Sequence, residues 1–152
     1  MPSTATGEDL RCRKQRAMTA GYSATPLTTK LGIKPGHAVA TVNEPDDFRS
    51  LLVDLPDNVR LDAQLADRPD VAVAFYTQRG DLEADFASLA EAVFPDRTIW
   101  VAWPKKAAKV NTDLTGDVVR AIVLATKLVD VKVCAISETW SGLKVVWRKE
   151  HR

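Results

Sequence analysis

Three lysines, at positions 105, 106 and 109, stand shortly before a predicted helix that Thr112 or Asp113 is expected to cap. The first N–H groups of a helix have no acceptors within it, and the helix dipole favours negative charge there. Lys105, Lys106, Lys109 and Thr112 are therefore predicted to bind a phosphate or carboxylate. The alternative is a solvated basic loop before a self-capped helix, because Asp113 would compete with an anion for the same N–H groups.

Asn43 and Glu138 are the other polar residues that we expect at strand ends and include in the predicted ligand site. Asn43 ends a predicted strand where nucleotide or S-adenosylmethionine binders usually carry a glycine-rich turn, which is absent. Glu138 precedes hydroxyl groups and an indole in the turn 138–142, where it could act as a general base. The alternative is a structural turn, with Trp140 covering the edge of the sheet.

Motifs for well-known chemistries are absent from the chain. The basic segment lacks the glycine spacing of a phosphate-binding P-loop, and no Gly-x-Ser-x-Gly nucleophile turn occurs. The two histidines and two cysteines have no metal-site spacing, so we expect no metal. The sequence therefore leaves the catalytic residues and the cofactor unknown.

Composition restricts the class of partner. The 21 Lys and Arg residues nearly balance 20 Asp and Glu in a chain of 152 residues, which gives no overall reason to expect nucleic acid. No apolar run is long enough to span a membrane. Cys12 lies in a polar segment and Cys134 in an apolar one, so we expect a reducing, cytoplasmic setting. A small anionic ligand or a protein partner remains open, as does the oligomeric state.

The helices and strands that must position these residues alternate along the chain. Residues 18–152 are expected to form a single domain. Residues 1–17 are polar and without apolar period, which predicts a disordered tail, an over-extended gene start or a basic interaction arm. We expect strands at 37–43, 59–64, 71–76, 98–103, 131–136 and 143–147, and helices at 27–31, from Pro45 to Leu55, from Asp81 to Val93, and from Thr112 or Asp113 to about Leu128. The first of these helices should end at Gly32. The spacing predicts that the third helix buries Leu82, Phe86, Leu89 and Val93, and that the last helix has a buried stripe of Leu114, Val118, Ala121, Ile122, Ala125 and Leu128.

This alternation predicts an α/β fold, a three-layer Rossmann-like domain whose mostly parallel sheet has an order near 2-1-3-4-5. The connection before the last strand is too short for a parallel crossover, so an antiparallel hairpin should form the C-terminal edge. The link between the second and third strands has no room for a full helix. Four loops, 43–47, 77–81, 104–113 and 137–142, should gather at the strand ends where such sheets usually bind ligands.

Four segments read AGYSATPLTTKLGIKPG (20–36), NEPDDF (43–48), WPKKAAKVNTDLT (103–115) and ETWSGLKVVWR (138–148). Together they resemble the bacterial domain of unknown function 3052 family, over about residues 19–149. The resemblance implies a small intracellular bacterial protein of Rossmann-like architecture. It implies no activity.

Two functional hypotheses follow from these observations. The first is a non-enzymatic binding or regulatory domain with an anion or small-ligand site at the strand ends. The alternative is a small transferase-type enzyme that uses the same cleft, with Glu138 or Asp113 as acid or base. A deep pocket joining Asn43, Lys105 and Glu138 would favour an enzyme or a ligand binder, whereas a flat surface would favour a protein partner.

Overall fold

A computed structural model describes residues 26–52 and 55–152 of the chain. The predicted tail, residues 1–17, lies outside the described residues, as does Cys12. Within the described part, no helix has the length and apolar character needed to cross a membrane.

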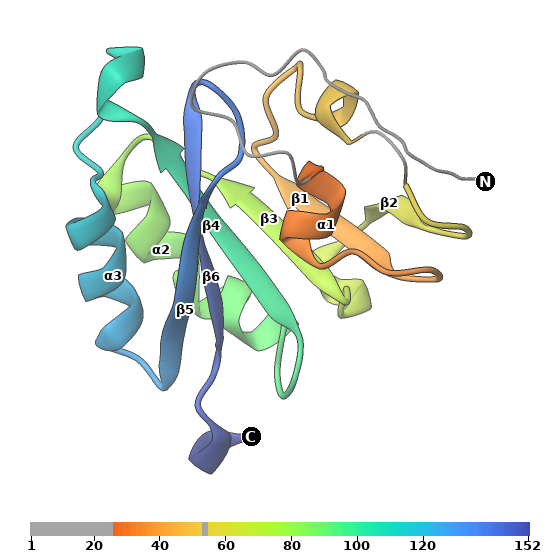
Figure 1. Ribbon diagram of the computed structural model, residues 1–152. Coiled ribbons are helices and arrows are strands. Elements are labelled where there is room, and N and C mark those ends of the chain that lie inside the picture. The colour runs from red at the N-terminus through yellow and green to blue at the C-terminus, as the bar shows by residue number, and fades with distance from the viewer. Residues whose placement is uncertain (1–25, 53–54) are drawn as a thin grey trace.

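A six-stranded sheet forms the centre of the molecule, in the order β2-β1-β3-β4-β6-β5 (Figure 1). β1 to β4 are parallel, and β6 is antiparallel to both β4 and β5. The predicted α/β fold with a C-terminal antiparallel hairpin is therefore confirmed. The predicted order near 2-1-3-4-5 is wrong at its end, because the hairpin folds back so that β6 pairs with β4 and β5 is the edge strand. The strands are β1 (Ala38–Val42), β2 (Arg60–Ala63), β3 (Val71–Phe75), β4 (Thr98–Pro104), β5 (Leu128–Ala135) and β6 (Trp140–Trp147).

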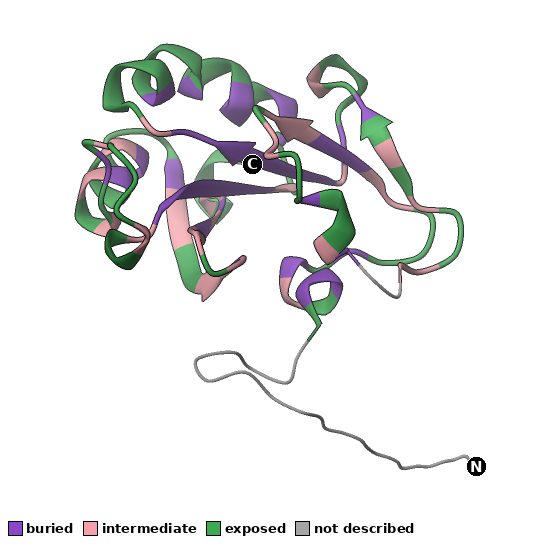
Figure 2. Cartoon of the chain, turned by 90° about the horizontal axis from the view of Figure 1, so that it is seen from above, coloured by how far each residue is buried: buried purple, intermediate pink, exposed green. Residues whose placement is uncertain are grey.

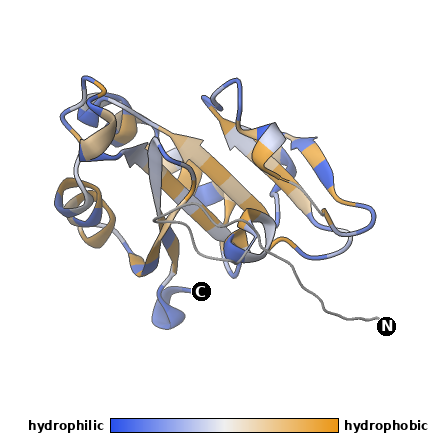
Figure 3. Ribbon diagram, turned by 45° about the horizontal axis from the view of Figure 1, so that its top comes forward, coloured by the Kyte–Doolittle hydropathy of each residue, from blue (hydrophilic) through white to orange (hydrophobic). Residues whose placement is uncertain are grey.

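Alternating side chains along β3 and β4 divide the core into two halves. Val73 and Trp100 face one side of the sheet, and Ala74 and Val101 face the other. Both strands are buried on both faces, as expected for the middle of a parallel sheet. Figures 2 and 3 show these central strands as buried and largely hydrophobic between exposed, hydrophilic connections.

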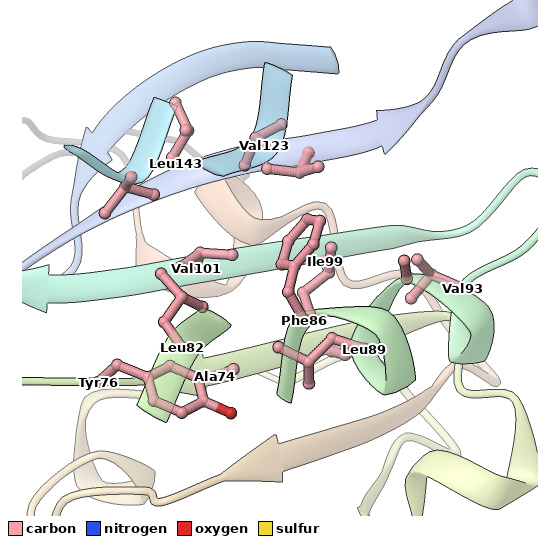
Figure 4. Packing of buried hydrophobic residues seen from close by; sticks show 14 of the residues in the cluster. Ala74, Tyr76, Leu82, Phe86, Leu89, Val93, Ile99, Val101, Val123 and Leu143 are labelled. Carbon is pink, nitrogen blue, oxygen red and sulfur yellow. The ribbon is translucent and has the colours of Figure 1, made fainter. Parts of the chain in front are cut away.

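The helix α2 (Arg79–Ala92) packs on the face that carries Ala74 and Val101, next to α3 (Gly116–Leu124). Its buried side chains include those predicted from the sequence spacing, Leu82, Phe86, Leu89 and, just past the end, Val93, together with Ala90 and Ala92. Figure 4 shows them directed toward the side chains of β3 and β4. The apolar period of α2 therefore identified its contact with the sheet correctly.

The other face, which carries Val73 and Trp100, is covered by α1 (Leu27–Leu31) and by the 3-10 turn Arg49–Leu51. Gly32 ends α1 in the left-handed conformation, with φ of 77°, as its position predicted. The helix expected from Pro45 to Leu55 is wrong. The hydroxyl of Ser50 donates to the carbonyl of Asp47 at 2.7 Å, and such local bonds compete with α-helix.

The long helix predicted between Thr112 and Leu128 is shorter at both ends. Thr115 is its N-cap, because its Oγ1 accepts a hydrogen bond from the backbone N–H of Val118 at 3.2 Å. Thr112 and Asp113 are not available for capping α3, because they bond to the connection after β3. At the other end, the hydroxyl of Thr126 donates to the carbonyl of Val123 at 2.5 Å, and β5 begins at Leu128.

The predicted buried stripe of this helix is also partly wrong. Val119 and Val123 are fully buried, whereas Ala121 and Ala125 are exposed. The side of α3 that packs on the sheet is centred on Val119 and Val123, with Val118 and Ile122 partly buried beside them. The link between β2 and β3 contains only the 3-10 turn Leu65–Asp67, which agrees with the prediction that a helix does not fit there.

Candidate functional site

The carboxyl ends of β1, β3 and β4 meet at one edge of the sheet, together with the turn between β5 and β6 (Figure 1). The side-chain amide of Asn43, after β1, donates to the carbonyl of Phe75, in β3, at 3.1 Å. The backbone N–H of Lys105, after β4, donates to the carbonyl of Thr139 at 2.7 Å. The prediction that these loops gather at one edge is confirmed.

Thr112 and Asp113 fasten the long loop after β4 to the connection between β3 and α2. The hydroxyl of Thr112 donates to the carbonyl of Thr77 at 2.6 Å. Asp113 accepts from the backbone N–H of Arg79, the first residue of α2, at 2.6 Å. The carboxylate of Asp113 therefore serves the N-terminus of α2, and the predicted competition between Asp113 and an anion at α3 does not arise.

A cavity of about 500 Å³ lies between the end of β4 and the first turn of α3. It brings together Lys105, Lys106 and Thr112 of the predicted anion site. It also includes the N-cap Thr115 and the carboxylate of Asp117. Sequence reasoning missed Thr115 because Thr112, Asp113 and Thr115 are all good caps within a few residues, and spacing alone does not choose among them.

Three residues of the predicted set contribute nothing to the lining of this cavity. Lys109 is exposed after the 3-10 turn Lys106–Ala108 and has a left-handed backbone, with φ of 56°. The backbone of Asn43 is also left-handed, with φ of 57°, and its side-chain amide donates to the carbonyl of Phe75. Glu138 is exposed in the turn between β5 and β6. The cavity at the end of β4 therefore does not join Lys105 to Asn43 or Glu138.

Glu44, which sequence reasoning did not select, has the most extensive side-chain bonding at this edge. Its Oε1 accepts from the hydroxyl of Thr41 at 2.6 Å, and its Oε2 accepts from Nε of Arg49 at 2.9 Å. Burial alone would raise the pKa of Glu44, but the hydrogen bonds from Arg49 and Thr41 and the charge of Arg49 together hold this pKa below its usual range. No regular spacing in the sequence predicts these contacts of Glu44.

Tyr76, directly after β3, was also missed. Its hydroxyl donates to Asp85 Oδ2 of α2 at 2.7 Å. Burial, this hydrogen bond and the nearby charges of Asp85 and Asp81 raise the pKa of Tyr76 well above its ordinary value. A tyrosine at the end of an apolar strand is a general signal for a buried ring with a hydrogen-bonded hydroxyl.

Trp140 has the structural role that was weighed against function. Its ring meets Phe75 edge-to-face at a centroid distance of 5.1 Å, and Phe75 meets Phe48 in the same way at 5.0 Å. Trp140 therefore packs on a face of the sheet, in an inner strand, and does not cover the edge of the sheet. Over the described ranges, no group of three His, Cys, Asp or Glu side chains is placed to hold a metal ion.

Comparison with protein family models found no match, and neither did comparison with curated proteins. Among solved structures, the chain is similar to a candidate methyltransferase from Thermoplasma acidophilum, with a TM-score of 0.50 and 11% identity over 84% of this chain and 76% of that one. It is also similar to magnesium protoporphyrin IX methyltransferase from Synechocystis PCC 6803, with a TM-score of 0.49 and 10% identity over 80% and 74%. At such identities the likeness concerns the fold. The chain therefore has an α/β Rossmann-like fold.

Proposed function

We propose that the chain is a small transferase-type domain that binds a substrate carrying a phosphate or carboxylate at the carboxyl edge of its sheet. The observation that carries this proposal is the cavity of about 500 Å³ at the end of β4, with Lys105 and Lys106 in its lining. Membership of the domain of unknown function 3052 family is part of the same proposal.

The transferase class is supported by the architecture. The similar structure from Thermoplasma acidophilum is described as a candidate methyltransferase. In open α/β sheets, ligands bind beyond the carboxyl ends of the strands, which is where this cavity lies. The reaction class is inferred by analogy with the fold, and the negative charge of the substrate is inferred from the lysines that line the cavity.

An anion in this cavity would meet favourable groups from two elements. The ammonium groups of Lys105 and Lys106 come from the loop after β4. The first turn of α3 contributes backbone N–H groups that have no acceptors within the helix, beside the hydroxyl of Thr115. Asp117 opposes them with one carboxylate, so we expect modest affinity that increases at low salt.

The methyl donor that the fold suggests, S-adenosylmethionine, does not fit the turn after β1. There is no glycine between residues 37 and 79, so no position in this turn allows the close backbone approach that such cofactors usually need. The carboxylate of Glu44 is already bound by Thr41 and Arg49. No step of the proposed reaction is assigned to this cofactor.

A thermal-shift screen of the full chain with inorganic phosphate, nucleotides, phosphorylated metabolites and S-adenosylhomocysteine tests the proposal. A ligand at one hundred times its dissociation constant should stabilise the fold by about 2.7 kcal/mol. The double variant Lys105→Ala, Lys106→Ala should lose the shift. Lys109→Ala is the matched control, because this lysine belongs to the same loop but does not line the cavity. Equal shifts in the double variant and the parent would refute the site.

The second candidate function is a non-enzymatic binding domain that uses the same cavity. It is favoured by the positions of the two predicted acid or base residues. Asp113 is occupied by the backbone N–H of Arg79, and Glu138 does not line the cavity. Incubating the protein with any ligand found in the screen, followed by mass spectrometry, separates the candidates. A transferred group supports the transferase, whereas an unchanged ligand supports the binding domain.

A further inference from the structure

A second and larger cavity, of about 870 Å³, lies between the C-terminal halves of α2 and α3, at the amino edge of the parallel strands. It is remote from the carboxyl edge and independent of the function proposed there. The volume is within the range of small-molecule sites, which are about 300–1,000 Å³. Its walls are mainly apolar, with Phe86, Ala87, Ala90, Phe94, Ile122 and Trp147 among the residues that line it.

The unequal lengths of the two helices create this cavity. α2 has 14 residues and α3 has nine. At a rise of about 1.5 Å per residue, α3 is shorter by roughly 7 Å, and the cavity lies beside the end of α2. Phe94, just past that end, is 36% exposed. The residues after α3, from Ala125 to Lys127, turn into β5 and form part of the cavity lining.

The aromatic wall of the cavity is ordered by its own contacts. Phe94 and Trp147 meet edge-to-face at a centroid distance of 4.9 Å. The indole N–H of Trp147 donates to the carbonyl of Ala90 at 2.9 Å, so its polar atom is already bonded. The wall therefore offers a bound molecule apolar ring surface, and burial of apolar surface is the main source of affinity available there.

Charged side chains of the cavity are unevenly distributed. Arg68 and Lys127 lie in the connections that lead into β3 and β5, at the amino edge of the sheet. Nη1 of Arg68 donates to the carbonyl of Phe94 at 3.3 Å, which holds this cation beside the aromatic wall. Glu91 is the carboxylate of this region. Glu83, nearer the N-terminus of α2, forms an ion pair with Arg79 at 3.2 Å.

We propose that this cavity binds a free amphipathic anion, a small molecule with an apolar chain or ring system and one carboxylate or sulfonate. Among the residues that line the cavity, two cations face the single carboxylate of Glu91, since Glu83 is paired with Arg79. The acid group of the ligand lies toward Arg68 and Lys127. Its apolar part lies along Phe86 and Ile122, between the two helices.

Titration of the full chain with anilinonaphthalene sulfonate, a dye that becomes fluorescent in apolar sites, tests this proposal. Dodecanoate below its micelle concentration should displace the dye. Ala87→Trp fills the cavity and should weaken binding of both by roughly tenfold or more. Ala84→Trp is the matched control, because Ala84 is exposed on the same helix but does not line the cavity, and it should bind like the parent.

Charge variants test the proposed orientation. Lys127→Gln should weaken dodecanoate and leave the neutral analogue dodecanol unchanged, and Glu91→Gln should strengthen dodecanoate. Equal affinities in Ala87→Trp and Ala84→Trp, or no displacement of the dye by dodecanoate, would overturn the site. A dimer of the parent that Ala87→Trp converts to a monomer would also overturn it, because a second copy of the chain would then cover the cavity.

Discussion

The two edges of the sheet are built from different interactions, although α2 takes part in both. At the carboxyl edge, loops from four connections are joined by hydrogen bonds, such as those from Asn43 to Phe75 and from Lys105 to Thr139. At the amino edge, α2 and α3 diverge around an apolar cavity whose wall is the ring pair Phe94 and Trp147.

The interactions that build each edge also determine which kind of ligand the edge can bind. Hydrogen bonds between loops satisfy backbone groups and leave charged side chains at the surface, which suits a small polar ligand. A short helix beside a longer one leaves apolar surface without a partner, which suits an apolar ligand. One helix connects the edges, so changes along α2 should separate their contributions.

The largest expected effect on the free energy of unfolding concerns the amino edge of the sheet. Phe86 is only 4% exposed and packs between α2 and the sheet. Phe86→Ala should lower the free energy of unfolding by about 3–5 kcal/mol, measured by urea denaturation. Phe94→Ala, at the open rim, should cost only about 0.5–1.5 kcal/mol. Similar losses for the two variants would contradict the distinction between core and rim.

The next effect concerns the carboxyl edge. Asp113→Ala removes the acceptor for the N–H of Arg79 and should destabilise the protein by about 0.5–2 kcal/mol, the usual range for loss of an N-terminal cap. Asp113→Asn keeps an acceptor oxygen and should retain most of the stability. If both variants unfold at the denaturant midpoint of the parent, the loop is not fastened to α2 by this side chain.

A smaller effect should depend on pH. The lowered pKa of Glu44 means that its contribution to stability is present above the unfolded pKa of about 4.3 and is lost as the pH falls through the folded value. Arg49→Gln should raise this pKa, measured by NMR titration. Its cost at pH 7 should be at most about 1 kcal/mol, because the pair is partly exposed, and should shrink in acid.

The Glu44→Gln background provides the control for this experiment, because it removes the titrating group. In that background, Arg49→Gln should cost the same at neutral and acidic pH. A cost that still falls with pH would assign the effect to a group other than Glu44.

The smallest effect on stability should come from the proposed anion site itself. Lys105→Ala with Lys106→Ala should change the free energy of unfolding by less than about 0.5 kcal/mol, as for surface substitutions in general. A larger loss by urea denaturation would mean that these lysines support the fold of the loop, and the carboxyl edge would then depend on them for more than ligand binding.

Features that depend on residues close together in the chain could be predicted from the sequence. The spacing of Leu82, Phe86 and Leu89 identified the buried face of α2, and Gly32 identified the end of α1. The alternation of strands and helices predicted the α/β class. Of the candidate site, it identified the gathering of the loops and the lysines of the cavity, because parallel strands end at a common edge.

Features that depend on residues distant in the chain could not be predicted from the sequence and are seen in the folded structure. Asp113 caps α2 instead of α3 because Arg79, which is 34 positions away, lies beside it. β6 lies between β4 and β5 because it pairs with the distant strand β4 as well as with its hairpin partner β5, and no local pattern in the sequence predicts the pairing with β4. The large cavity at the amino edge likewise follows from the difference in length between two helices that meet only in the folded chain.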